Sequence, residues 1–237
     1  MVDDVSSSNF NYYLLHKPKG IVCSTVDSTI NDPKHTERVH TTIYEYIERK
    51  GIQLTQNLHP IGRLDADTTG IILITDDKKL LKLIRDPNET RDDINPYKEK
   101  EYILTLLAKK YHKLWTWTNN EENEICESLS EPFTFNRHNL LMECSKANVT
   151  FISRWQDKEL MRNTDFPFLG WCLQVKVKIQ EGKNHQVRRM AKRLGFQVIS
   201  LVRTKISRIL DIESVPNEGD IRQLTIDEVS ELYLGFK

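Results

Sequence analysis

The sequence predicts an α+β fold with a mixed, mainly antiparallel central sheet and flanking helices. Residues 173–179 alternate apolar and polar side chains with the period of a half-buried strand, whereas residues 185–194 place their apolar side chains at helical spacing. Such strand and helix patterns follow one another along the chain without the regular alternation of βαβ units, and there is no internal repeat. A layered α+β domain is the architecture that fits this order.

The first predicted elements are two short strands, at 11–15 and 21–25, where aromatic and β-branched residues concentrate. The segment between them is basic and contains Pro18 and Gly20, which predict a turn. Residues 1–9 lack the basic and apolar segments of a signal peptide, and we expect them to form a flexible tail.

Two helices are predicted from their capping residues. Thr42 and Glu45 have the spacing of a capping box, in which each side chain bonds the other residue's backbone amide, so a helix is predicted over 42–50. The same spacing recurs at Thr225 and Glu228, directly before a last predicted helix.

The middle of the chain begins with a continuous apolar run at 71–75, which predicts a buried strand. Two aspartates after it open a helix that ends before Pro87. The segment 86–100 is rich in Asp, Asn and Pro, so we expect a long loop before a strand at 102–107.

Residues 109–165 are expected to form a divergent, peripheral insertion in a single domain that spans 10–237. Within the insertion, residues 119–131 carry five Glu and no basic residue. The elements predicted after it are a strand at 173–179, a helix at 185–194 with Asn184 as its N-cap, and strands at 196–203 and 205–212.

The composition excludes several classes of protein. The chain has 237 residues, and its 34 Lys plus Arg balance 34 Asp plus Glu. No apolar run approaches the ~18–20 residues of a membrane span, so we expect a globular protein without a membrane partner. The four cysteines are widely spaced, which predicts unpaired structural thiols in a reducing compartment and a cytoplasmic protein: Cys23, Cys126, Cys144 and Cys172.

The zero net charge conceals a segregation of charge along the chain. Residues 181–208 contain eight Lys or Arg against one acid, Glu181, a local balance of +7. The C-terminal stretch 211–237 has seven acids against two basic residues, a local balance of −5. Nucleic-acid binding is therefore not excluded by the neutral total, because binding depends on local charge.

The basic block includes the predicted helix 185–194. On it, Arg188 and Lys192 lie four residues apart, as do Arg189 and Arg193, so each pair shares one face. Such an array suits a phosphate backbone, and a solvated helix face is the alternative explanation. His185, at the start of this helix, is better explained as a polar contact than as a general base.

A polar loop bounded by glycines precedes the buried strand at 71–75. Its sequence is Gly62-Arg63-Leu64-Asp65-Ala66-Asp67-Thr68-Thr69-Gly70. Loops anchored on core strands often carry catalytic groups. From the residues alone, its two aspartates have three further explanations: turn or capping residues, the carboxylate pair of a small-molecule hydrolase, and a metal site, for which the necessary His or Cys ligands are lacking.

Four segments together resemble the RsuA/RluB/RluE/RluF family of ribosomal RNA pseudouridine synthases. The segments are Leu-His-Lys-Pro-Lys-Gly at 15–20, Gly-Arg-Leu-Asp-x-x-Thr-Thr-Gly at 62–70, Lys-Glu-Tyr at 100–102 and Glu-Gly-Lys-Asn-His-Gln-Val-Arg-Arg-Met at 181–190. Their order and separations also fit the family. The stretch from Gly219 to Thr225 resembles the end of the family's catalytic domain, so the likeness covers about 10–110 and 170–235.

The resemblance implies a pseudouridine synthase fold with a cleft between two sub-domains, and isomerisation of a specific, flipped-out uridine in RNA. The N1–C1′ bond breaks and the base is rejoined through C5, without a cofactor. The implied catalytic residue is Asp65. Arg188 matches the cation that keeps this carboxylate ionised, and Tyr102 matches the tyrosine that stacks on the target base.

The substrate implied by the resemblance is structured ribosomal RNA. The residues expected to hold it are Lys17, Lys19, Arg63, Lys183, Asn184, His185, Gln186, Arg189, Lys192 and Arg203. Many relatives begin with an S4 RNA-binding domain, but only about ten residues precede the first predicted strand here. We therefore expect a monomeric catalytic domain without S4, nearest the RluE-like members that modify large-subunit RNA. The competing hypothesis is a catalytically inactive RNA-binding protein of ribosome assembly with the same fold.

Overall fold

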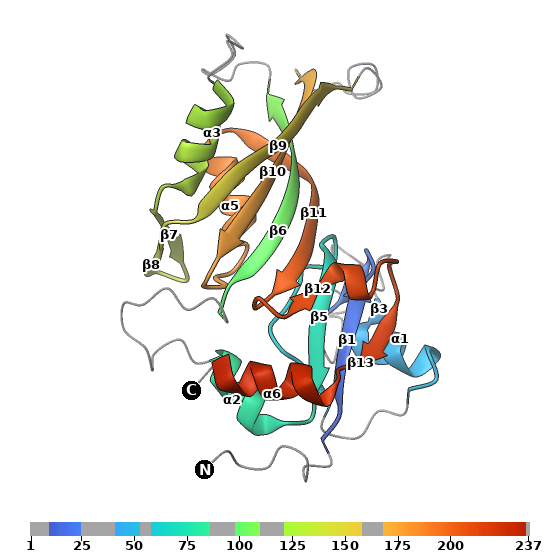
Figure 1. Cartoon of the computed structure of the whole chain (residues 1–237). Helices are drawn as coiled ribbons and strands as arrows, with labels where there is room; N and C mark the ends of the chain where they lie inside the picture. Colours follow the sequence, from blue (N-terminus) through green and yellow to red (C-terminus); the bar gives the residue numbers. More distant parts are fainter. Residues whose placement is uncertain are drawn as a thin grey trace. The chain divides into compact units, whose positions relative to one another are not determined.

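A computed structural model (Figure 1) describes residues 10–24, 41–52, 58–85, 98–109, 121–157 and 168–235. The chain divides into two compact units. The first unit combines two separate segments, Met1–Lys98 and Arg203–Lys237, whereas the second is the continuous segment Glu99–Val202. Helices and mainly antiparallel strands build both units, which confirms the predicted α+β class.

The first unit is built around strand β1, which lies between β13 and β5 and runs antiparallel to both. The short strands β2 and β3 pair in parallel, so the strand pairing is mixed. Its elements are β1 (Tyr12–Lys17), β2 (Ile21–Val22), β3 (Thr41–Thr42), α1 (Ile43–Arg49), β4 (His59–Pro60), β5 (Thr69–Thr75), α2 (Lys78–Arg85), the end of β11 (Phe196–Ile206), β12 (Leu210–Asp211), the 3-10 helix η4 (Ile212–Ser214), β13 (Ile221–Gln223) and α6 (Ile226–Gly235).

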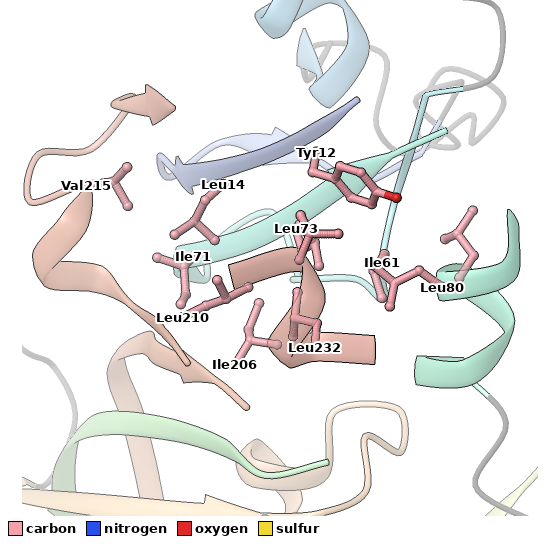
Figure 2. Packing of buried hydrophobic residues seen from close by; sticks show 12 residues of the cluster. Tyr12, Leu14, Ile61, Ile71, Leu73, Leu80, Ile206, Leu210, Val215 and Leu232 are labelled. Carbon is pink, nitrogen blue, oxygen red and sulfur yellow. The ribbon is translucent and has the colours of Figure 1, made fainter. Parts of the chain in front are cut away.

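The core of the first unit packs the inner face of β1 and β5 against helices α2 and α6 (Figure 2). Leu14 of β1 is opposite Leu73 of β5 in the strand register, and both are fully buried. Leu80 of α2 and Leu232 of α6 belong to the same cluster and are also fully buried. The core thus joins residues from both ends of the chain.

Capping interactions set the starts of the helices in this unit. Both predicted capping boxes are confirmed. The Thr42 hydroxyl accepts a hydrogen bond from the Glu45 amide while the Glu45 carboxylate accepts one from the Thr42 amide. Thr225 and Glu228 make the same reciprocal pair at α6. At α2, a carboxylate oxygen of Asp77 accepts hydrogen bonds from two amides of the first turn.

In the described residues, the second unit contains the N-terminal part of β11 and seven further elements. They are β6 (Lys100–Lys109), α3 (Glu121–Ser130), β7 (Phe133–Arg137), β8 (Leu140–Cys144), β9 (Asn148–Gln156), β10 (Phe168–Ile179) and α5 (Gln186–Arg193). Strand β10 lies between β6 and β9 and is antiparallel to both. Its side chains from 172 to 179 alternate between buried and half-buried positions, apart from the neighbouring buried pair Cys172 and Leu173, as the period of the sequence predicts.

Part of the segment 109–165 belongs to the main sheet, at its edge among the described strands. Its strand β9 pairs with β10 from Gln156 to Asn148, so it forms part of the sheet. The acidic stretch forms helix α3, and an ion pair of 3.0 Å joins Glu122 of α3 to Arg154 of β9. The second unit therefore includes this part of the segment as a structural element.

Two predicted boundaries are wrong. Residues 196–206 form one strand, β11, instead of two strands that meet near residue 204, because the chain turns only at Ser207, whose φ is +61°. Helix α5 is capped by His185 in the left-handed region, with φ +53°, and not by Asn184; the His185 side chain makes no capping hydrogen bond.

Several expectations lie outside the described residues: the tail 1–9, most of the loop 86–100, and segments 110–120 and 158–167 of the expected insertion. In the described ranges, no helix has the length and apolarity needed to cross a membrane. All four cysteines are buried and free, as predicted, and burial raises the pKa of each thiol, to about 11 for Cys126.

Candidate active site

The loop that carries Asp65 joins β4 to β5 and is held by the β1–β2 turn. The Gly20 amide donates to the Ala66 carbonyl over 2.7 Å, directly beside Asp65. On its other side, the Leu64 amide donates to the Cys23 sulfur over 3.4 Å. The loop is also closed internally, because the Thr68 amide donates to the Asp65 carbonyl. Asp65, itself half-buried, is therefore fixed at both neighbouring residues.

Lys17 also links this loop to the sheet. Its side chain is fully buried at the end of β1, and its ammonium donates to the carbonyls of Pro18 at 2.9 Å, Ile21 at 2.8 Å and Ala66 at 3.4 Å. Burial lowers the pKa of Lys17 to about 8, although nearby negative charges, Asp65 among them, oppose that shift. Lys17 was expected to contact RNA, but its ammonium is surrounded by carbonyls, which makes it a positioning residue.

Cys23 lies among the charged groups of the loop. Burial raises the pKa of its thiol, and the Leu64 amide and the positive charges of Lys17 and Arg203 act in the opposite direction. The negative charge of Asp65 raises it further. The Cys23 sulfur is therefore within the electrostatic influence of the candidate carboxylate and of two buried cations, which its spacing in the sequence does not predict.

Arg203 is buried, and its side chain links β11 to β5. It is 2% exposed, and its Nε donates to the Ile71 carbonyl over 2.7 Å. Among the described residues, its buried Nη2 has no hydrogen-bond partner. Gly70 lets the two strands approach: a Cβ there would lie 2.3 Å from the Arg203 carbonyl oxygen, and φ is +108°. The expected RNA contact of Arg203 is thus replaced by a structural one.

Two residues of the first unit remain suited to direct RNA contact. Lys19 and Arg63 are exposed, in the β1–β2 turn and in the Asp65 loop respectively. The Lys19 amide donates to the Glu218 carboxylate over 3.3 Å, which leaves the side chain outside this bond.

The second unit holds the other two residues expected to be catalytic. Tyr102 lies on β6 opposite Val177 of β10 and is 8% exposed. Arg188 is half-buried in the first turn of α5. Their approach to Asp65 stays a prediction, because Asp65 belongs to the first unit.

A carboxylate network fixes the segment that leads into α5. Glu181 accepts hydrogen bonds from the Gln186 amide group at 2.7 Å and from the Ser145 backbone at 2.8 Å, and it pairs with Lys183 at 2.7 Å. Gln186 is 3% exposed and also accepts a hydrogen bond from the Lys183 amide. Gln186 was expected to bind RNA, but these contacts make it a positioning residue, and Glu181 is a contributor that charge counting alone overlooks.

The two arginines that share one face of α5 each lie over an aromatic ring of strand β7. The guanidinium of Arg189 lies over the Phe135 ring, 4.2 Å from its centroid, and that of Arg193 lies 5.2 Å from the centroid of Phe133. Lys192 is exposed, as is His185, while Asn184 and Lys183 are half-buried. The predicted helical register of these residues is confirmed.

Comparison with known proteins places these motifs in a family. The family model for RNA pseudouridylate synthase matches residues 11–193, most of the chain. The chain belongs to the RNA pseudouridylate synthase family. Members of this family isomerise uridine in RNA to pseudouridine, and the match includes the Asp65 loop, Tyr102 and Arg188.

Individual pseudouridine synthases are similar over nearly the whole chain. Ribosomal small subunit pseudouridine synthase A of Escherichia coli (strain K12) is 29% identical over 92% of this chain and 72% of its own length. The protein of the same description from Haemophilus influenzae is 31% identical over 93% of this chain and 73% of its own length. A crystal structure of a pseudouridylate synthase superposes with a TM-score of 0.59 at 28% identity, covering 94% of this chain and 74% of that one.

Proposed function

We propose that this pseudouridine synthase modifies a specific uridine of ribosomal RNA in the cytoplasm, as a monomer, with Asp65 as its catalytic carboxylate. The C1′–N1 bond breaks, a C1′–C5 bond forms, C5 loses its proton and N1 gains one, so the reaction needs no cofactor. A carboxylate takes part by attacking sugar or base, or by a glycal-like route, and must be ionised for direct attack.

The anchoring of Asp65 is the observation that carries this proposal. Gly20 and Cys23 hold the residues on either side of it, and Lys17 ties the same loop to β1. A reacting group fixed by a rigid scaffold loses little freedom in the transition state. Asp65 is also among the negative charges that act on the buried ammonium of Lys17.

Tyr102 and Arg188 complete the proposed site. Tyr102 is proposed to stack on the released base, an interaction worth roughly 1–3 kcal/mol for an unpaired base. Arg188 is proposed to pair with Asp65 when the RNA is bound. Lys19, Arg63, Lys183, Asn184, His185, Arg189 and Lys192 are proposed to contact the RNA, whereas Lys17, Gln186 and Arg203 hold the elements that present them.

Release of tritium from RNA labelled at uridine C5 tests the catalytic role of Asp65. Wild type is expected to release tritium in proportion to pseudouridine formed, and Asp65→Asn to release none above background while it still binds the RNA. Asp67→Asn is the matched control, because Asp67 is an exposed carboxylate of the same loop. Equal background release by wild type and Asp65→Asn would favour an inactive RNA-binding protein, and equal losses in both variants would favour a carboxylate pair.

The choice of ribosomal RNA is tested in the same assay. Small-subunit RNA is the favoured substrate, because the similar proteins from E. coli and H. influenzae are described as small-subunit synthases. The likeness to RluE-like members predicts a large-subunit target instead. Transcripts of both subunits, followed by mapping of the modified position, decide between them.

A further inference from the structure

Strands β7 and β8 form a two-stranded hairpin in the second unit (Figure 1). The two residues that connect them, His138 and Asn139, have φ values of +47° and +65°. A two-residue connection with both residues in the left-handed region is typical of the type I′ turn, which matches the twist of the strands. The hairpin therefore has a defined turn and a fixed register.

The end of this hairpin exposes two leucines in succession. Leu140 is 66% exposed and Leu141 is 62% exposed. Consecutive residues of a strand point to opposite faces. Since both are exposed, neither face is covered at this end by the described residues, and the hairpin projects as an arm. Adjacent exposed leucines commonly mark an interaction surface.

One face of the hairpin is occupied by the arginines of α5. By the strand register, Phe133, Phe135, Arg137, Leu140 and Met142 lie on this face. Arg193 stacks on Phe133 and donates hydrogen bonds to the carbonyls of Ser128 and Pro132, so it secures the base of the arm. The only acidic residue of the two strands, Glu143, lies on the opposite face.

The guanidinium of Arg189 lies over the Phe135 ring, and its terminal nitrogens are available. Its Nε donates to the Asn184 carbonyl over 3.1 Å, and no described residue accepts a hydrogen bond from its two Nη groups. A planar guanidinium with free Nη groups is suited to bidentate binding of phosphate. A protein partner that covered the leucines alone would leave these donors without a partner.

We propose that the β7–β8 hairpin is an RNA-binding arm, in which Arg189 binds a phosphate and Leu140 and Leu141 pack against unpaired bases. The proposal rests on the proposed function, because it extends the RNA contact of α5. Apolar side chains at the end of such an arm pack against base steps that are unstacked. Specific recognition of RNA targets loops and bulges, where bases of this kind are available.

Filter binding to a labelled transcript of small-subunit ribosomal RNA tests the arm. Leu140→Ser/Leu141→Ser is expected to weaken binding about tenfold, in the range for loss of contact with one base. The matched control is Ile226→Ser/Leu234→Ser on α6, whose side chains are 69% and 59% exposed. The control is expected to bind within about twofold of wild type.

Arg189 and Phe135 are tested as a coupled pair. Arg189→Gln is expected to reduce the slope of log K against log salt by about one, the value for one phosphate. Phe135→Leu is expected to weaken RNA binding when made in the wild-type protein but to have no further effect in the Arg189→Gln variant. The ring contributes only by positioning the Arg189 guanidinium, so the two effects are coupled. Additive effects of the two substitutions would overturn this part of the proposal.

A photocrosslinking residue, p-benzoylphenylalanine, at position 141 gives a direct readout in an otherwise unchanged chain. A crosslink to the RNA, absent with the same residue at 226, supports the arm. Equal affinities of the leucine variant and wild type, or no crosslink from 141, would overturn it. A dimer of wild type that becomes a monomer in the leucine variant would instead assign the leucines to self-association.

The arm and the proposed function fail in distinguishable ways. If wild type releases tritium while the leucine variant binds RNA normally, the arm is wrong and the enzyme assignment stands. If wild type binds RNA through the arm but releases no tritium from either ribosomal RNA, the proposed function fails and the arm stands.

Discussion

Lys17 shows how a turn residue becomes part of a core. The Lys-Pro-Lys-Gly sequence predicts a basic turn, in which both lysines would face solvent. Lys19 does so, but the Lys17 ammonium donates to three carbonyls, from the β1–β2 turn, β2 and the Asp65 loop. The difference follows their place in the chain, because residues 14–17 of β1 are all buried whereas residue 19 lies in the turn.

The pKa of Lys17 predicts a pH dependence of stability. Burial lowers it to about 8 from 10.5, so between these values the unfolded state binds more protons than the folded state. The free energy of unfolding of wild type should therefore rise with pH relative to Lys17→Met, by at most about 2–3 kcal/mol between pH 7 and 10. Urea unfolding at the two pH values measures this difference.

Lys19→Met is the control for that experiment, since Lys19 is exposed in the same turn. Its stability should follow the pH dependence of wild type. Parallel pH profiles for Lys17→Met and wild type would mean that Lys17 titrates alike in the folded and unfolded states, contrary to its burial.

At the scale of elements, Asp77 joins three parts of the first unit. One oxygen accepts hydrogen bonds from the Tyr12 hydroxyl of β1, at 2.7 Å, and from the Tyr233 hydroxyl of α6. The other caps the first turn of α2. Burial and the hydrogen bond to Asp77 raise the pKa of Tyr233. A single buried carboxylate thus fixes a strand and two helices.

Removing this carboxylate should destabilise the protein strongly. Asp77→Ala leaves two tyrosine hydroxyls and the α2 amides without their acceptor, and we expect a loss of about 3 kcal/mol in the free energy of unfolding. Tyr233→Phe removes one of these bonds and should cost about 1 kcal/mol. Chemical denaturation measures both values, and Asp227→Ala, at an exposed position in the first turn of α6, is the control.

If Asp77→Ala were no more destabilising than Asp227→Ala, the junction would not contribute to stability. The same series also tests whether β1, α2 and α6 unfold together, since probes in each element should then report one transition.

Elements with local chemical signals could be predicted from the sequence. Thr42 and Thr225 mark helix starts because a capping box requires only residues three positions apart. The pairing of β9 with β10 could not be predicted from the sequence. Strand pairing depends on contacts across the whole sheet, and no local residue pattern marks it. The capping position of His185 could not be predicted, because a left-handed backbone conformation before a helix is set by surrounding contacts and not by the residue type.

Some residues of the candidate site could likewise be predicted from the sequence, and others could not. The Asp65 loop was found by its polar, glycine-bounded sequence next to a buried strand. Burial of Lys17 and Arg203 was not foreseen, since lysine and arginine in a basic segment are normally exposed. The stacking of Arg189 on Phe135 depends on residues more than fifty positions apart, which helical spacing alone does not connect.

At the scale of the whole molecule, the first unit is discontinuous in sequence. Its core includes Leu14 and Leu73 from the first segment and Val229 and Leu232 from the last. Strand β13 also covers one edge of β1. Neither segment contains a complete core.

Truncation after residue 220 should therefore prevent cooperative folding of the first unit. The truncated chain lacks β13 and α6, which exposes Leu14 and one edge of β1. We expect loss of a single sharp thermal transition and increased binding of a hydrophobic dye. A truncated chain that unfolds cooperatively near the temperature of the full chain would show that α6 is dispensable.

The shared carboxylate of Asp77 has a consequence for synthesis. Tyr12 is among the first described residues to leave the ribosome and Tyr233 among the last, yet both donate to the same oxygen. The first unit cannot complete its core until residue 233 has emerged, whereas all of Glu99–Val202 emerges earlier. During translation, β1 and β5 therefore lack their final cover until the C-terminal segment has emerged, so apolar residues of the first unit stay exposed longest.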